Sequence, residues 1–266
     1  MAAAERGLWA YCVARAAEPL PARLPGVDPD HALERIEHGP LAALVSRVAL
    51  AEYGAAALQR NLNDFRWLER VARAHEAVLE GALADATIVP LRLCTIFDDE
   101  DGVRAMLDGS GAELSAGLDA LAGREEWTVK LLVDREALDG AARAQAPEGE
   151  VDAAAGSGAG YMLRRRRDRE VRELAGRLAA GLAEEAHVHI RAAAADSVVG
   201  RPQNPELSGH EGEMLLNAAY LVERERVDRL RELVAELQER HRELGARLEL
   251  SGPLPPYNFV TQGAPA

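Results

Sequence analysis

Cysteine is almost absent from this chain of 266 residues, since Cys12 and Cys94 are the only two. Small secreted domains that rely on disulfide bonds need several pairs, so this class is excluded. Each cysteine lies in an apolar segment, as buried thiols usually do. We therefore expect two free, buried thiols in a protein of a reducing compartment.

Long hydrophobic runs and an excess of positive charge are also missing. No stretch approaches the roughly 20 apolar residues that cross a bilayer, and the segment Met1–Arg6 lacks the apolar core of a signal peptide. Lysine and arginine together number 31 against 44 acidic residues, which gives a net charge of −13. Nucleic-acid binding needs clustered cations, so we expect a soluble, cytoplasmic chain with neither nucleic-acid nor membrane partners.

The first half of the chain combines short strands with amphipathic helices. Strands are predicted over residues 7–14, 33–38, 41–47 and 87–93, with a Gly39-Pro40 turn between the second and third. Asn63-Asp64 opens a helix whose apolar residues, with His75 among them, recur at helical spacing up to Leu83. Asp98-Asp99 caps a further helical region that Gly123 ends.

The second half has the order strand, helix, strand, strand, helix, strand. The predicted strands are 127–133, 187–192, 214–222 and 246–250, and the predicted helices are 161–185 and 225–244. This βαββαβ order is that of ferredoxin-like domains, with helices on one face of an antiparallel sheet. We therefore predict an α+β fold with a first domain over 1–123, a ferredoxin-like domain over 124–250 and an extended tail over 251–266. Residues 139–160 and 196–213 are predicted to be long loops.

Candidate metal and catalytic motifs are weak. His187-Val188-His189 would place two imidazoles on one strand face, but no third ligand is evident, and an ordinary solvent-facing strand is favoured. The contiguous carboxylates Asp98–Asp101 do not have the alternating spacing of a calcium loop. Glycines 156–160 lack the Lys-Ser/Thr ending of a phosphate loop. We predict no catalytic residue, no metal site and no cofactor.

Arginines form one dense basic cluster, Arg164, Arg165, Arg166 and Arg167, in this otherwise acidic chain. Acidic residues at helical spacing, such as Glu170, favour a solvated face with ion pairs along the helix. A surface that binds phosphate, RNA or an acidic protein is the alternative.

Near residue 253 the sequence has a stiff proline segment, and aromatic residues follow it. Pro253, Pro255 and Pro256 fix an extended backbone, and Tyr257, Asn258 and Phe259 follow. Exposed termini are usually small and polar, so this segment is predicted to dock. Folding back onto its own domain is favoured, and contact with a partner is the alternative.

Eight segments spread along the chain form a specific pattern through their order and spacing: residues 7–11, 38–46, 75–79, 87–97, 127–130, 160–165, 216–222 and 251–260. In these segments the chain resembles the GvpF/GvpL family of gas vesicle accessory proteins. Two positions depart from the family pattern, since Cys94 replaces an expected glycine and Leu254 an expected tryptophan.

The resemblance implies a role in building gas vesicles, which are hollow protein shells made of small, very apolar subunits. Such subunits would aggregate through apolar patches and open strand edges. The implied function is to bind the shell subunit and assist nucleation or growth of the vesicle, together with other accessory proteins. We expect Arg92, Thr95, Phe97, Tyr257, Asn258 and Phe259 to contact the shell subunit and Arg164–Arg167 to contact acidic accessory partners. The alternative is a small-molecule sensor or enzyme on a ferredoxin-like scaffold.

Overall fold

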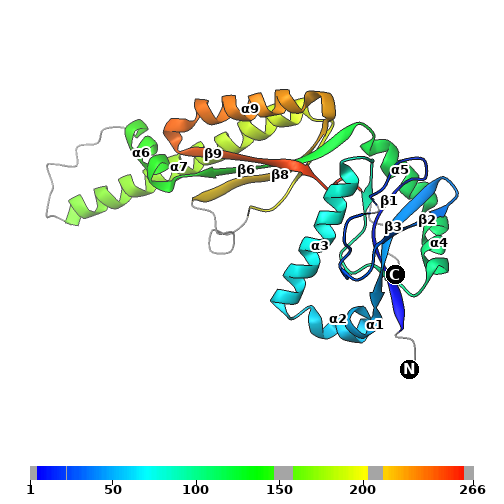
Figure 1. The fold of residues 1–266 in the computed structure, drawn as a ribbon. Helices are drawn as coiled ribbons and strands as arrows, with labels where there is room; N and C mark the ends of the chain where they lie inside the picture. The colour runs from blue at the N-terminus through cyan, green and yellow to red at the C-terminus, as the bar shows by residue number, and fades with distance from the viewer. Residues whose placement is uncertain (1–4, 22, 147–157, 203–211, 261–266) are drawn as a thin grey trace. The chain divides into compact units, whose positions relative to one another are not determined.

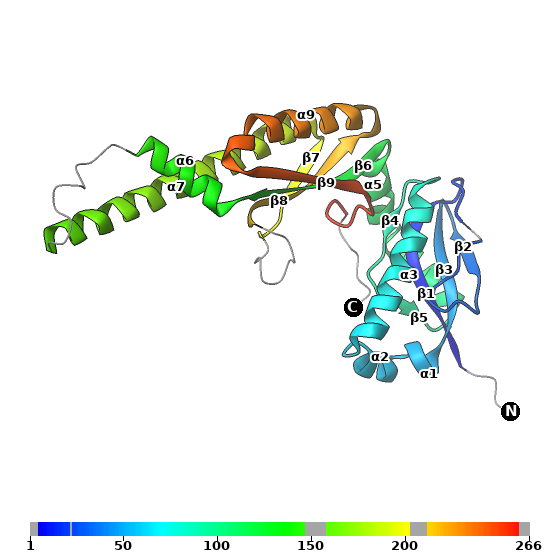
Figure 2. The same ribbon diagram turned by 60° about the vertical axis from the view of Figure 1, so that its left-hand side comes forward.

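The computed structural model describes residues 5–21, 23–146, 158–202 and 212–260. They form two compact units. The first contains the chain up to Glu126 together with the segment from Pro253 onward, and the second contains Trp127–Gly252. Figures 1 and 2 show helices and strands in both units.

The sheet of the first unit has the order β2-β3-β1-β4, and β5 also pairs with β1. Its main strands are β1 (Arg6–Arg15), β2 (Leu33–His38) and β3 (Leu41–Ala49), and all their pairings are antiparallel. The short strands β4 (Val89–Pro90) and β5 (Ile96–Phe97) complete it. Gly39 has φ +57° at the β2–β3 turn, as the Gly39-Pro40 turn requires.

Helices cover both faces of this sheet, which explains why residues 8–14 of the central strand β1 are all buried. Helix α3 (Phe65–Leu83) lies on one face, and α4 (Glu100–Gly109) and α5 (Gly111–Leu121) lie on the other (Figure 1). The side chains of Asp64 and Asp99 accept hydrogen bonds from the first turns of α3 and α4. The predicted helix start at Asn63-Asp64 and the predicted cap at Asp98-Asp99 are therefore confirmed. Two short helices, α1 (Leu50–Tyr53) and α2 (Ala55–Asn61), precede α3 and were not predicted.

The second sheet has the order β7-β8-β6-β9, built from β6 (Arg124–Val133), β7 (Asp196–Val199), β8 (Glu213–Glu223) and β9 (Ala246–Leu254). The long helix α7 (Gly158–Ala193) and α9 (Val227–Arg240) pack on one face of it (Figures 1 and 2). Helix α6 (Arg135–Gln145) lies beside α7. The short 3₁₀ helices η2 (Arg224–Arg226) and η3 (Arg242–Leu244) flank α9.

Four predicted elements are corrected by the structure. Residues 187–192 are the last turns of α7, because Leu182, Ala186 and Ile190 continue its buried stripe. Residues 139–145 belong to α6, and the loop predicted over 196–213 begins with the strand β7. The strand predicted over 87–93 is only Val89–Pro90, since Pro90 has no N–H for a longer ladder. Parts of both loop predictions, 147–157 and 203–211, lie outside the described residues.

Candidate functional site

Tyr257 fixes the C-terminal segment onto the first unit. Its hydroxyl lies 3.3 Å from Nε2 of His75 and 3.4 Å from the carbonyl oxygen of Leu91. The prolines before it, Pro255 and Pro256, are buried. The segment Pro253–Val260, called the tail below, therefore docks within the unit that also holds the start of the chain.

His75 is the buried centre of this contact and has no exposed surface. The indole N–H of Trp9 donates to its Nδ1 at 3.0 Å, which leaves the ring proton on Nε2, facing Leu91 and Tyr257. Burial lowers the pKa of His75 from 6.5 to about 4. The imidazole is therefore neutral at physiological pH, and this arrangement suits a structural link better than proton transfer.

Asn258 makes the second anchor, on a buried carboxylate. Its backbone N–H donates to Oε2 of Glu126 at 3.1 Å, and its side-chain amide donates to Oε1 at 2.6 Å. Glu126 is only 2% exposed, and burial raises its pKa, although the two hydrogen bonds oppose that shift. The tail thus supplies the donors that a buried carboxylate requires.

The predicted strand-end residues lie in the segment Arg92–Phe97, next to the tail. Cys94 and Ile96 pack against the same apolar cluster as Tyr257. Arg92 is exposed, and the Thr95 hydroxyl donates to its carbonyl oxygen at 2.7 Å in a tight turn. Phe97 is half-buried in β5. The structure therefore brings Arg92, Thr95 and Phe97 into the same unit and region as Tyr257.

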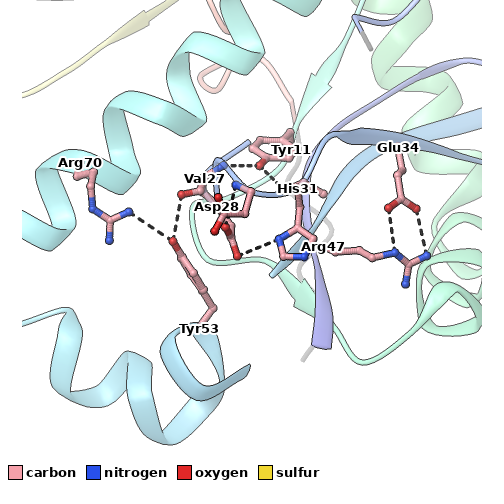
Figure 3. A network of polar contacts seen from close by, with 10 residues as sticks. Tyr11, Val27, Asp28, His31, Glu34, Arg47, Tyr53 and Arg70 are labelled. Carbon is pink, nitrogen blue, oxygen red and sulfur yellow. Dashed lines mark hydrogen bonds and ion pairs between the residues drawn. The ribbon is translucent and has the colours of Figure 1, made fainter. Parts of the chain in front are cut away.

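A second polar network holds the loop before β2. Figure 3 shows the hydroxyls of Tyr11 and Tyr53 directed at Val27. Tyr11 accepts from the Val27 N–H at 2.9 Å, and Tyr53 donates to the Val27 carbonyl at 3.0 Å. Nearby, the Arg47 guanidinium pairs with both carboxylate oxygens of Glu34, at 2.9 and 3.1 Å (Figure 3). The two tyrosine contacts are structural, because each hydroxyl bonds the backbone of Val27.

The arginine cluster lies on the first turns of α7, in the second unit. Arg166 pairs with Glu170 at 2.8 Å, and the guanidinium of Arg165 lies 5.8 Å from the ring centre of Tyr161. The favoured interpretation of ion pairs along the helix thus accounts for part of the cluster. Three neighbouring apolar side chains are exposed: Tyr161 at 54%, Met162 at 65% and Leu163 at 45%.

The histidine pair considered as a metal site lies on a helix. Nδ1 of His187 is 2.9 Å from the hydroxyl of Tyr220, and Nδ1 of His189 is 2.8 Å from a carbonyl oxygen of its own helix. Across the described ranges, no group of three or more metal-binding side chains occurs. Helices long and apolar enough to cross a membrane are likewise not found there. Both cysteines are free, and burial raises the pKa of the Cys12 thiol to about 12.

Trp9, His75 and Glu126 are the site residues that sequence reasoning did not single out. His75 stands within an apolar stripe of its helix, a pattern that marks it as buried but names no partner. Glu126 precedes the apolar alternation of β6 and falls on the opposite face from Trp127 and Val129, where solvent exposure is the usual expectation. The distant Asn258 supplies the hydrogen bonds that the buried carboxylate requires.

Comparison with known proteins identifies relatives over nearly the whole chain. The family model described as "Gas vesicle synthesis protein GvpL/GvpF" matches residues 7–261. Gas vesicle protein L of Streptomyces sp. (strain CB03234) is 36% identical over 225 residues, covering 85% of this chain and 82% of that protein. Gas vesicle protein F of the same strain is 32% identical over 262 residues, covering 95% and 98%.

Two solved structures share the fold. The gas vesicle protein GvpF of Anabaena sp. PCC7120 superposes with a TM-score of 0.71 at 21% identity, over 96% of both chains. GvpF of Microcystis aeruginosa gives a TM-score of 0.65 at 20% identity, over 95% of this chain and 98% of that one. The fold and the sequence matches agree, and the resemblance noted in the sequence is confirmed: this chain belongs to the GvpL/GvpF family of gas vesicle synthesis proteins.

Proposed function

We propose that this protein binds the apolar shell subunit of the gas vesicle and assists nucleation or growth of the shell. Its place of action is the gas vesicle or its assembly intermediates in the cytoplasm. Family membership supports a role in vesicle synthesis. The single observation that supports this choice of contact surface is the docking of the tail beside the segment Arg92–Phe97 in the first unit.

The proposed contact surface is formed by residues of both segments that keep accessible surface. Arg92 and Asn258 are exposed, and Thr95, Phe97 and Phe259 are half-buried. We expect an extended segment of the shell subunit to bind beside the two-residue strand β5 by strand addition. Tyr257 serves as the positioning residue, since its hydroxyl is already used within the unit.

We also assign the second unit to the ferredoxin-like class, as a domain over 124–250 that follows a first domain over 1–123 and precedes the tail. Support comes from the element order β6, α7, β7, β8, α9, β9 and from the sheet order β7-β8-β6-β9. In this assignment β7 takes the place of the strand expected at residues 187–192. The helix α6 is an addition to the pattern.

A pull-down with purified shell subunit tests the proposed function. Phe259→Ala and Phe97→Ala are expected to reduce capture of the shell subunit several-fold, and Tyr257→Ala with Phe259→Ala to abolish it. Tyr257→Phe keeps the ring and removes only the hydroxyl, so it controls for loss of the internal hydrogen bonds. Unchanged binding and normal vesicle formation in the Tyr257→Ala, Phe259→Ala variant would refute the contact surface.

The alternative of a small-molecule sensor or enzyme has no support among the relatives, which are named for gas vesicles. The arginines Arg164–Arg167 are proposed to recruit acidic accessory proteins of the same assembly system. That part of the function concerns a different unit from the tail and can be tested separately.

A further inference from the structure

The first turns of α7 lie outside the hydrophobic core of the second unit and carry exposed apolar and basic side chains. Figures 1 and 2 both show this end of α7 extending beyond the sheet and past α6. The buried stripe of the helix begins at Val171 and continues through Ala175. Between residues 161 and 170 only Arg167 is half-buried, and every other side chain is exposed.

Exposed apolar surface is concentrated on this short stretch. Tyr161, Met162 and Leu163 are three of the eight large hydrophobic side chains with substantial exposure among the described residues. Neighbouring large apolar side chains left in water mark interaction surfaces more often than isolated ones. Methionine in particular adapts its shape to different partners.

Arginines surround these apolar side chains. Met162, Leu163, Arg165, Arg166, Arg169 and Arg172 line one surface hollow of about 470 Å³. Residues 162, 165, 166, 169 and 172 recur at helical spacing, so they share one face of α7. Over residues 161–173 there are six arginines against three carboxylates, a net charge of +3 in a chain of net charge −13.

The carboxylates of α7 neutralise only part of this charge. Arg166 pairs with Glu170 at 2.8 Å and Arg169 with Glu173 at 3.7 Å. Arg164 and Arg172 have no ion-pair partner within the described part of the chain. Exposed arginines with unused N–H groups suit carboxylates on a partner, which they bind through two parallel hydrogen bonds.

We propose that this surface, the α7 tip (residues 161–172), binds an acidic amphipathic helix of a partner protein. The partner's leucine-type side chains would cover Met162 and Leu163, and its carboxylates would pair with Arg165 and Arg172. The inference rests on the proposed function only in identifying the physiological partner as an accessory protein of gas vesicle assembly. Like charges disfavour pairing of two α7 tips, and the apolar side chains favour a protein over a nucleic acid.

A fluorescent synthetic peptide tests the surface on the full-length chain. The probe is an amphipathic helical peptide with leucines on one face and glutamates on the other, and a scrambled peptide of equal composition is its control. Fluorescence anisotropy is expected to show binding of the amphipathic peptide alone, weakened by added salt. Equal binding of both peptides would overturn the proposal.

Matched substitutions on the same helix locate the site. Arg165→Glu with Arg172→Glu, and separately Met162→Ser with Leu163→Ser, are each expected to raise the Kd of the peptide at least tenfold. Arg177→Glu and Val188→Ser are exposed controls outside the α7 tip and are expected to leave the Kd unchanged. If both double variants of the α7 tip bind the peptide like the parent chain, the assignment is wrong.

Two competing occupants have their own readouts. Light scattering that shows a dimer lost in the Met162→Ser, Leu163→Ser variant would make the surface a contact between two copies. A single-stranded oligonucleotide that binds tighter than the peptide and depends on Arg165 and Arg172 would make it a nucleic-acid site. Either result refutes the proposal.

Capture of the shell subunit is measured in parallel and is expected to be unchanged in the tip variants. Loss of capture in these variants, or no capture by the parent chain, would count against the proposed function instead.

Discussion

Asn258 donates hydrogen bonds to both oxygens of the Glu126 carboxylate, although the two residues are 132 positions apart. This pair joins the two chain segments that make up the first unit. A buried carboxylate without donors costs far more than an exposed one, so the tail is part of the fold of this unit.

Replacing Asn258 by alanine is expected to destabilise the first unit by about 1–3 kcal/mol, because a donor to a buried, charged acceptor is lost. Chemical denaturation followed by circular dichroism measures the change. Glu126→Gln with Asn258→Ala is the companion variant, expected to recover part of the loss since the buried charge is removed. An Asn258→Ala variant as stable as the parent chain would show that the tail contact is dispensable.

The buried Glu126 carboxyl also predicts an unusual pH dependence of the stability of the fold. Its folded-state pKa lies above its ordinary value of 4.5, so the folded state binds the proton more tightly than the unfolded chain. The contribution of Glu126 to stability therefore falls as the pH rises from about 4.5 through the folded pKa. Thermal unfolding of the parent chain and of Glu126→Gln between pH 4 and 7 is expected to show the difference shifting in favour of Glu126→Gln with rising pH. If the unfolding temperatures of the two proteins change in parallel with pH, the predicted effect of Glu126 is wrong.

The buried His75 predicts a pH dependence of stability that is opposite in sign to that of Glu126. Because burial lowers its pKa from 6.5 to about 4, the folded state resists protonation, and stability is lost as the pH falls through that interval. The loss amounts to about 3 kcal/mol, from about 1.4 kcal/mol per pKa unit. A protonated Nδ1 would also face the Trp9 N–H, donor against donor. NMR titration of the His75 ring is the direct measurement, and an ordinary pKa near 6.5 would contradict the burial argument.

Cys94 occupies a backbone conformation that suits glycine. Its φ is +67°, and it is the only non-glycine residue with positive φ in the described ranges. Cys94→Gly is expected to raise the free energy of unfolding by about 0.5–1 kcal/mol, because a Cβ in this region is strained. Cys94→Ala keeps the Cβ and is expected to bring no gain. Equal effects of the two substitutions would assign the change to the thiol instead.

Gly26 is required by space rather than by its backbone angle. A Cβ there would lie 2.6 Å from Oγ of Ser46 and 2.7 Å from the hydroxyl of Tyr11, which holds Val27. Gly26→Ala is expected to cost about 1–3 kcal/mol, as overpacking of a buried site does. Gly109→Ala, where a Cβ meets nothing within 4 Å, is the control and is expected to be neutral or slightly stabilising.

Most of the fold follows from local pattern, and the exceptions have physical reasons. The strands at residues 7–14, 33–38 and 41–47 and the long helices were predicted, because their apolar periodicity is strong. Residues 187–192 looked like a strand because Val188 and Ile190 alternate with polar residues. The longer repeat through Leu182, Ala186 and Ile190 shows the helix only when the window is extended.

The contacts of the candidate site were less accessible to sequence reasoning. The tail was expected to dock, and its aromatic residue was named, but its receptors His75 and Glu126 lie 182 and 132 positions away. No local pattern connects such distant residues. The expected glycine at position 94 is explained only by the backbone angle that the structure provides.

The tail's return to the first unit has a consequence for synthesis on the ribosome. Translation proceeds from the amino end, so Glu126 emerges long before Asn258 exists to meet it. The intervening unit, Trp127–Gly252, must be made first. Until Asn258 has been synthesised, the first unit of the nascent chain lacks these two donors to its buried Glu126 carboxylate, so the first unit is completed only after the second unit has been made.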